Sequence, residues 1–344
     1  MKTTIPLFYP AVKTATRKFA AFAILALLCV TASASPPGTG GGTIYYIHQC
    51  CRTMWSMNSD GTNQTQLGYQ TYGPVSTQLY NGHRWFLDTR LISPPEYFPN
   101  GDLRGEVFAL RDDYDYNLNN NSATKVRLTN DITFQTYGEG TFSLHWVPGG
   151  QKISMIGRRW SGATILDGGI YTASLQFGPD GNITGLAAQP GAPAIPFPLG
   201  STGWPNVRSY DWDPTGTKIA YDDSSVLWLA DVIGSPSQLI YNGFSHTPAW
   251  SHDGNTIAFT NFNLGISTIK PNGTHLTQII RPTSSWTYDR VFWSPTDTNI
   301  VCYGYATATG DLDVFRAASN GNFLTNLTNT LGGSSTAEMP MGWR

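Results

Sequence analysis

The chain has 344 residues, a formal net charge of -2 and only 13% charged residues, so no basic stripe points to nucleic acid as a partner. Glycine (36 residues), proline (22) and aromatic residues (13%) are plentiful. That composition is typical of turn-rich all-β proteins and argues against a helical one.

The first 34 residues have the features of a signal peptide. Four basic residues between Lys2 and Lys18 precede the apolar stretch Phe19–Val30, which is short for a bilayer span. Ala32 and Ala34 then form an A-x-A pattern, which predicts cleavage after Ala34. We expect a signal peptide over 1–34, a Gly/Pro-rich linker over 35–42, and an exported protein, periplasmic or secreted, without a membrane span after cleavage. The alternative is an uncleaved membrane anchor.

Export makes disulfides possible, and the mature chain holds Cys50, Cys51 and Cys302. The two neighbours can bond to each other, one of them can bond to Cys302, or all three can stay reduced. The sequence contains no C-x-x-C and no Cys/His set with zinc-ligand spacing. The segment Asp112–Asn117 begins like a calcium loop but lacks the turn glycine and the bidentate glutamate. We therefore expect no metal and no cofactor.

A phrase centred on tryptophan recurs along the chain, and in each copy an isoleucine follows seven positions later. Fixed-offset repetition of this kind indicates a repeat architecture. The segment that begins at Leu79 fits the same frame, with Phe86 at the isoleucine position. The four clear copies pair Trp146 with Ile153, Trp212 with Ile219, Trp250 with Ile257, and Trp293 with Ile300.

A second phrase follows, made of an alternating strand, an Asp-Gly or Asn-Gly turn and another strand. It is clearest in Met54–Leu67, Ile266–Ile279 and Val314–Leu327. Such turns need positive φ, which glycine and asparagine tolerate best. Two hairpins give the four strands of one propeller blade, whereas a β-sandwich does not repeat a phrase at fixed offset.

Five complete blades can be counted, and the two ends of the chain supply complementary fragments. Ala337–Arg344 reads as a first strand that ends in its tryptophan, and Thr43–Cys51 reads as a second strand without a first. We predict an all-β, six-bladed β-propeller over 43–344, closed by pairing of the C-terminal strand with the N-terminal blade, which removes open sheet edges. The five complete blades are Val75–Leu128, Phe142–Leu186, Arg208–Leu239, His246–Ile279 and Arg290–Leu327.

Three segments resemble the WD40-like repeat of TolB-type propellers: PAWSHDGNTIAFTN (Pro248–Asn261), FWSPTDTNI (Phe292–Ile300) and MNSDGTNQTQL (Met57–Leu67). The resemblance extends over nearly all of the mature chain and is weak near Leu79. It implies the six-bladed fold and a bacterial, exported protein. Members of that family serve as exported scaffolds, in envelope complexes, or as propeller domains beside enzyme domains, so the resemblance says little about function.

In such a blade, the turns that join strands one to two and three to four lie on one face, and here they are tight. The opposite face is predicted to carry the long connections over 88–106, 157–169 and 187–207. These connections differ in length, as is common for loops that carry function. We therefore expect a ligand or partner on this loop-rich face. Arg158, Arg159 and Trp160 are candidate binding residues in one of these loops, and Trp160 and Trp286 are predicted to be exposed loop anchors.

Residues shortly before the inner-strand tryptophans are expected where the loop-rich face meets the channel. Mixed charges and aromatic rings can hold a polar ligand or a peptide end, and the alternative is a set of ion pairs between blades. These residues are Arg208, His246, Asp289, Arg290 and Glu338.

Motifs of catalysis are absent from the sequence. There is no G-x-S-x-G elbow, and the six histidines show no H-E-x-x-H spacing, so no catalytic residue is assigned. We expect a monomeric, non-catalytic propeller that binds a protein, peptide or carbohydrate ligand. The alternatives are a lyase or hydrolase with its site at the channel mouth, and a purely structural spacer.

Overall fold

The computed structural model describes residues 41–48, 53–70, 77–80, 82–91, 96–98, 101, 105–112, 124–131, 133–136, 144–201, 203, 205–223, 226–232, 237–261, 265–329 and 337–343. All the secondary-structure elements in these ranges are β-strands, and a helix able to cross a membrane is not found among them. The predicted signal peptide, the linker up to residue 40, Cys50, Cys51 and residues 113–117 lie outside the described residues.

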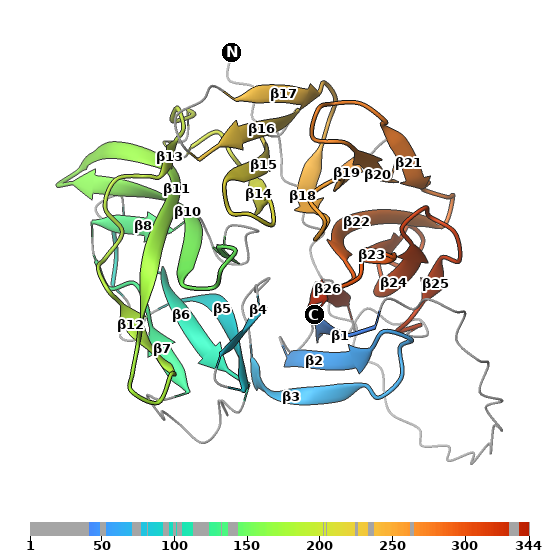
Figure 1. Ribbon diagram of the computed structural model, residues 1–344, viewed down its shortest axis with the longest axis horizontal. Helices are drawn as coiled ribbons and strands as arrows, with labels where there is room; N and C mark the ends of the chain where they lie inside the picture. The colour runs from blue at the N-terminus through green and yellow to red at the C-terminus, as the bar shows by residue number, and fades with distance from the viewer. Residues whose placement is uncertain are drawn as a thin grey trace, which may run out of the picture. The chain divides into compact units, whose positions relative to one another are not determined.

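The described residues belong to one compact unit, in which antiparallel sheets are arranged around a centre as the blades of a β-propeller (Figure 1). We number the blades in chain order. Blade 1 consists of β26 (Glu338–Trp343), β1 (Thr43–His48), β2 (Thr53–Asn58) and β3 (Thr65–Gln70). Blade 2 consists of β4 (Thr77–Tyr80), β5 (His83–Leu91), β6 (Gly105–Arg111) and β7 (Lys125–Arg127).

Blade 3 departs from four strands, because two short strands, β8 and β9, both pair with β10. Its strands are β8 (Phe134–Thr136), β9 (Leu144–Trp146), β10 (Lys152–Ser161), β11 (Thr164–Phe177), β12 (Ile183–Leu186) and β13 (Ile195–Pro196).

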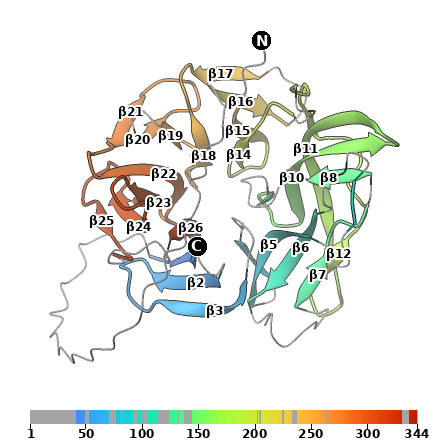
Figure 2. The same cartoon turned by 180° about the vertical axis from the view of Figure 1, so that it is seen from behind.

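Blades 4, 5 and 6 keep the regular order of four strands, which run from the centre outward in Figure 1. From behind, in Figure 2, β5, β6 and β7 of blade 2 likewise follow one another outward. Blade 4 is β14 (Ser209–Trp212), β15 (Lys218–Asp222), β16 (Leu227–Asp231) and β17 (Gln238–Tyr241). Blade 5 is β18 (His246–Trp250), β19 (Ile257–Asn261), β20 (Gly265–Ile269) and β21 (Thr277–Ile280). Blade 6 is β22 (Trp286–Trp293), β23 (Asn299–Ala306), β24 (Leu312–Ala318) and β25 (Thr325–Asn326).

The predicted closure is confirmed. Strand β26 pairs antiparallel with β1, so the C-terminal strand is the innermost strand of blade 1. The register places Trp343 opposite Ile44, which repeats the tryptophan–isoleucine pairing of the other blades. The same register is found for Trp146 with Ile153, Trp212 with Ile219, Trp250 with Ile257, and Trp293 with Ile300.

The core is divided among the interfaces between blades. Six clusters of buried apolar side chains each join two successive blades, and one of them joins blade 6 back to blade 1. In that closing cluster, Tyr46 and Trp343 pack with Val301 and Val314. Since burial of apolar area drives folding, each blade is stabilised mainly by its neighbours, and the closing cluster adds the missing contact at the chain ends.

The turn glycines explain why the Asp-Gly and Asn-Gly phrase recurs. Gly61, Gly273 and Gly321 all have positive φ, from 80° to 86°. A Cβ on Gly321 would come within 1.8 Å of the carbonyl oxygen of Ile279 in the preceding blade. Each turn therefore needs glycine for two reasons. Its backbone has a positive φ, and the backbone of the preceding blade approaches it closely.

Two features of blades 2 and 3 correct the sequence analysis. Residues 157–169 are not a long loop, because β10 continues to Ser161 and β11 begins at Thr164. The glycines there mark close approach within a sheet: a Cβ on Gly157 would lie 2.7 Å from the Phe134 ring. Leu79 does not fill the tryptophan position, because Phe86 pairs with Thr77 and Leu79 is 55% exposed.

Candidate functional site

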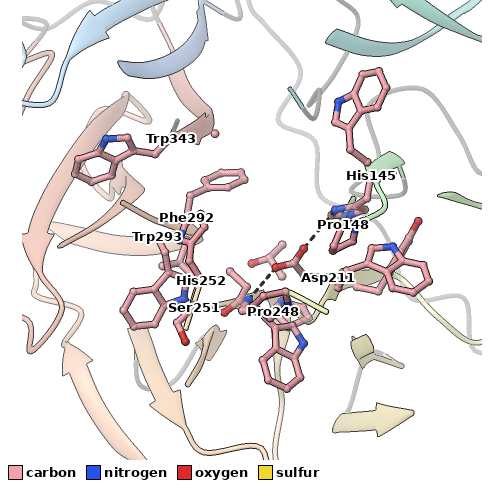
Figure 3. Close-up of a pocket in the computed structure, with 18 of the residues that line it drawn as sticks. His145, Pro148, Asp211, Pro248, Ser251, His252, Phe292, Trp293 and Trp343 are labelled. Atoms are coloured by element: carbon pink, nitrogen blue, oxygen red, sulfur yellow. Dashed lines mark hydrogen bonds and ion pairs between the residues drawn. The ribbon is translucent and has the colours of Figure 1, made fainter. Parts of the chain in front are cut away.

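A cavity of about 310 Å³ runs along the inner strands of all six blades. Its wall includes residues of β4, β9, β14, β18, β22 and β26, and it extends to the turns that join first to second strands, at Pro148, Pro214 and His252 (Figure 3). Its size is at the lower end of the range for small-molecule sites. The cavity is the candidate functional site.

The residue directly before each inner-strand tryptophan lies in the cavity wall. These residues are His145, Asp211, Ala249, Phe292 and Gly342. Successive side chains of a strand point to opposite sides, so a tryptophan that packs between blades directs its neighbour away from that interface. Blade 2 lacks the tryptophan and contributes Gln78 to the wall.

The five positions directly before the inner-strand tryptophans, together with Gln78, form a polar set and an apolar set around the wall. In blade order, Gln78, His145 and Asp211 come from blades 2, 3 and 4, and Ala249, Phe292 and Gly342 come from blades 5, 6 and 1. We call these the polar arc and the apolar arc. Figure 3 shows His145 and Asp211 across the space from Phe292 and Trp343. At these six positions a bound molecule would meet hydrogen-bonding groups on one side and apolar groups on the other, while Ser251, His252 and Arg290 add polar groups from blades 5 and 6.

Asp211 is held in place by contacts from both neighbouring blades. The backbone N–H of Trp250 in blade 5 donates to its Oδ2 at 2.8 Å, and His145 Nδ1 in blade 3 lies 3.6 Å from its Oδ1. The His145 ring also packs on Tyr210, with 4.5 Å between centroids. The side chains of His145 and Asp211 are 22% and 28% exposed, so both reach the cavity while their orientation is fixed.

Arg290 lies in the wall of the same cavity, within a β-bulge of β22. Its φ is 57°, and its backbone N–H donates to Thr260 of blade 5 at 3.1 Å. The guanidinium lies 5.9 Å from the centre of the Tyr303 ring. Burial lowers the pKa of Arg290 to about 10, against the opposing effects of Tyr303 and Asp289. A positive φ on a bulky residue is strained and is found where the surroundings fix it, often at binding sites.

His246 and Asp289 form a pair between blades 5 and 6, with 3.6 Å between His246 Nδ1 and Asp289 Oδ1. Asp289 also accepts hydrogen bonds from Tyr303 at 2.9 Å and Thr247 at 3.2 Å. Burial favours the neutral forms of both groups, but their mutual contact outweighs it. The pKa of His246 is therefore raised, and the pKa of Asp289 is held well below its usual range, with Arg290 contributing.

Of the predicted site residues, only Arg290 lines this cavity. His246 and Asp289 join two blades, and Glu338 is fully buried 3.5 Å from His48 within blade 1. Arg208 is exposed, just ahead of β14. For His246 and Asp289, the alternative of an ion pair between blades describes the geometry, whereas the contact of Glu338 lies within blade 1.

The predicted loop anchors at 158–160 are strand residues of β10. Arg158 and Trp160 are buried, and both donate to the side-chain oxygen of Gln135, Arg158 at 2.9 Å and Trp160 at 3.2 Å. Arg159 pairs with Asp167 on the neighbouring strand. These contacts tie strands together, and the expectation that Trp160 is exposed is wrong.

Trp286 is also a strand residue, the first of β22, and it is half-buried. Its ring packs edge-on against Phe315 of the same blade, with 4.9 Å between centroids. The expectation of a loop anchor is therefore wrong for Trp286 as well.

His145, Asp211 and Phe292 were missed as site residues, although the sequence contains a signal for them. Each directly precedes a repeat tryptophan, and the alternation of side chains along a strand places that position on the other side of the strand from the tryptophan. The β-bulges at 246–249 and 289–292 interrupt this alternation and were not visible in the repeat phrase.

The cavity differs in position from the predicted site. Its wall extends to the tight turns, and no described residue of the segments 88–106, 157–169 and 187–207, which were expected to form the binding face, lines it. Among the described residues, no group of three His, Cys, Asp or Glu side chains could hold a metal ion. Cys302 is a buried free thiol.

No protein-family model matches the chain, and no curated protein matches it. Among solved structures, a chain of a nidogen/laminin complex is 11% identical with a TM-score of 0.52, over 88% of this chain and 97% of that one. An oligogalacturonate lyase in complex with manganese is 12% identical with a TM-score of 0.42, over 77% and 76%. A candidate 6-phosphogluconolactonase from Bacteroides fragilis is 12% identical with a TM-score of 0.48, over 90% and 99%. At these identities the likeness concerns the fold alone: the chain is a six-bladed β-propeller.

Proposed function

We propose that this chain is an exported, non-catalytic propeller of the WD40-like TolB type that binds a peptide or carbohydrate ligand in its central cavity. The observation that carries the proposal is the division of the wall into the polar arc and the apolar arc. Sites for small ligands combine an apolar lining with a few convergent polar groups in this manner. Export is supported by the basic, apolar and A-x-A pattern of the first 34 residues.

The polar groups are preorganised for binding. Asp211 is fixed by the Trp250 amide and by His145, so it loses little side-chain freedom when a ligand arrives. Arg290 is likewise fixed by its bulge and by the ring of Tyr303. A wall whose polar groups are already ordered favours affinity for a complementary ligand.

The test is a titration of the purified protein with panels of peptides and glycans, in which intrinsic tryptophan fluorescence reports binding. Five tryptophans line the cavity, Trp146, Trp212, Trp250, Trp293 and Trp343, so occupancy should alter their emission. Asp211→Asn and Phe292→Ala should each weaken binding about tenfold or more, which corresponds to about 1.4 kcal/mol. Two controls outside the cavity, Asp311→Asn and Phe323→Ala, should leave binding unchanged. Binding that is unaffected by Asp211→Asn and Phe292→Ala would place the ligand elsewhere and refute the proposal.

A second candidate is an enzyme, a lyase or hydrolase that uses the same cavity. The pairing of His145 with Asp211 favours it, because a histidine oriented by a carboxylate is a suitable general base. Turnover of a glycan or peptide probe, lost in His145→Gln with binding retained, would favour the enzyme. Saturable binding of a glycan or peptide probe, without turnover of any probe that binds, would favour the binding protein.

A further inference from the structure

We infer that the ligand of the cavity is a neutral sugar ring, with its apolar face against the apolar arc and its hydroxyl edge toward the polar arc. The inference rests on the proposed function, since it names the ligand class of that same site. Three features of the wall carry it: its charge balance, the hydrogen-bonding capacity of the polar arc, and the open space beside Phe292.

Each charged group of the wall has a polar or oppositely charged neighbour. Asp211 lies beside His145, and Arg290 lies next to Asp289, whose charge favours the guanidinium. A cation in the cavity would be opposed by Arg290, and an anion would be opposed by Asp211. The wall therefore favours an uncharged ligand.

The polar arc offers donors and acceptors side by side. The Gln78 amide both donates and accepts, His145 offers ring nitrogens, and the Asp211 carboxylate accepts. A hydroxyl group also donates and accepts at one atom, so neighbouring hydroxyls on a ring can satisfy all three groups. Specificity follows because a ligand without those hydroxyls would displace water from these partly exposed groups without replacing its hydrogen bonds.

The apolar arc leaves room for a flat surface. Phe292 stands between Ala249 and Gly342, the smallest side chains available at these positions. A Cβ on Gly342 would meet no atom within 4 Å, so the space over Gly342 is open at that point of the wall. The C–H face of a pyranose is flat and apolar and would be removed from water there, which stabilises the complex.

Gly342 also provides the sharpest test, because its substitution fills the cavity without a clash. Gly342→Val adds two methyl groups where no atom lies within 4 Å of the new Cβ, and the φ of Gly342 is not positive. The matched control is Gly185→Val in β12, where a Cβ also meets nothing within 4 Å and which lies outside the cavity wall. Both variants should melt close to the parent protein.

The experiment is calorimetric titration of the full chain with an array of neutral pyranose oligosaccharides, uronic acid oligosaccharides, free amino acids and short peptides. The expected result is saturable binding of a neutral oligosaccharide, weakened about tenfold or more by Gly342→Val and unchanged by Gly185→Val. Cavity-dependent binding confined to amino acids, peptides or uronic acids would overturn the inference while the proposed function stands. Sugar binding that survives Gly342→Val would also overturn it, and binding of no probe at all would remove both.

Discussion

The indole N–H of Trp343 donates a hydrogen bond of 2.6 Å to the carbonyl oxygen of Gly41, so residues 302 positions apart meet at the closing blade. Trp343 also stands opposite Ile44 in the register of β26 with β1 and is only 2% exposed. Trp343 therefore belongs to the strand that closes the ring, to the apolar cluster between blades 6 and 1, and to the cavity wall. Stability and binding are both expected to depend on this position.

Replacement of Trp343 by alanine should lower the free energy of unfolding by about 3 to 5 kcal/mol, because a fully buried large side chain is removed from the closing cluster. Trp286→Ala is the matched control, since Trp286 is half-buried and packs within one blade. Urea unfolding followed by circular dichroism measures both variants. An equal loss for the two would show that blade closure adds nothing to stability.

Gly321→Ala should destabilise the protein by about 2 kcal/mol or more. The backbone there has a φ of 85°, and the new Cβ would overlap the carbonyl oxygen of Ile279 at 1.8 Å. Gly185→Ala, in an open and ordinary strand conformation, should change stability by about 0.5 kcal/mol or less. Thermal melts of the two variants side by side test this, and a Gly321→Ala protein as stable as Gly185→Ala contradicts the close approach between blades.

The pair of His246 and Asp289 should make stability depend on pH. The pKa of His246 is raised above its unfolded value, so its contribution is complete below about pH 6.5 and is lost as the pH rises through the folded pKa. The pKa of Asp289 is lowered, so its contribution is present above about pH 4 and is lost only at more acidic pH. The charged groups that act on His246 are Asp289, Asp222 and Arg290.

The melting temperature of the parent protein should therefore exceed that of His246→Gln by more at about pH 5.5 than at about pH 8.5. The difference in melting temperature between the two proteins reports on His246 alone, because the other histidines are present in both. A double variant, His246→Gln with Asp289→Asn, should lose less than the sum of the single variants, because the pair is removed together. A difference that is the same at both pH values would mean that folding does not raise the pKa of His246.

Cys302 should not react with thiol reagents in the folded protein. It is 1% exposed, and burial with the nearby Asp289 raises the pKa of its thiol, so the reactive thiolate is scarce. Alkylation with iodoacetamide, mapped by mass spectrometry, should label Cys302 only after denaturation. Rapid labelling under native conditions would show that blade 6 opens readily or that the thiol is exposed.

Much of the fold could be predicted from local patterns in the sequence. The spacing of Trp250 and Ile257, and of its equivalents, predicted the pairing of first and second strands, because a fixed offset specifies a hairpin of fixed length. The fragments at the two ends predicted the closing blade. Blade 2 was less predictable, since Leu79 stands in a different register and no tryptophan marks the first strand there.

The candidate site was predicted poorly, because it depends on side-chain direction and on contacts between blades. Arg158 and Trp160 were assigned to a loop because of the glycines around them, whereas those glycines allow close packing inside a sheet. His246 and Asp289 were placed near the channel, but the bulges of β18 and β22 set which side chains face it.

By itself, the sequence determined the number of blades, the hairpins and the closure, because each of these follows from patterns within a few residues of one another or from the complementarity of two ends. Only the tertiary structure decided which side chains share the cavity, because His145, Asp211 and Phe292 come from three blades. Their meeting depends on the packing of whole sheets around a centre, and no local spacing encodes that arrangement.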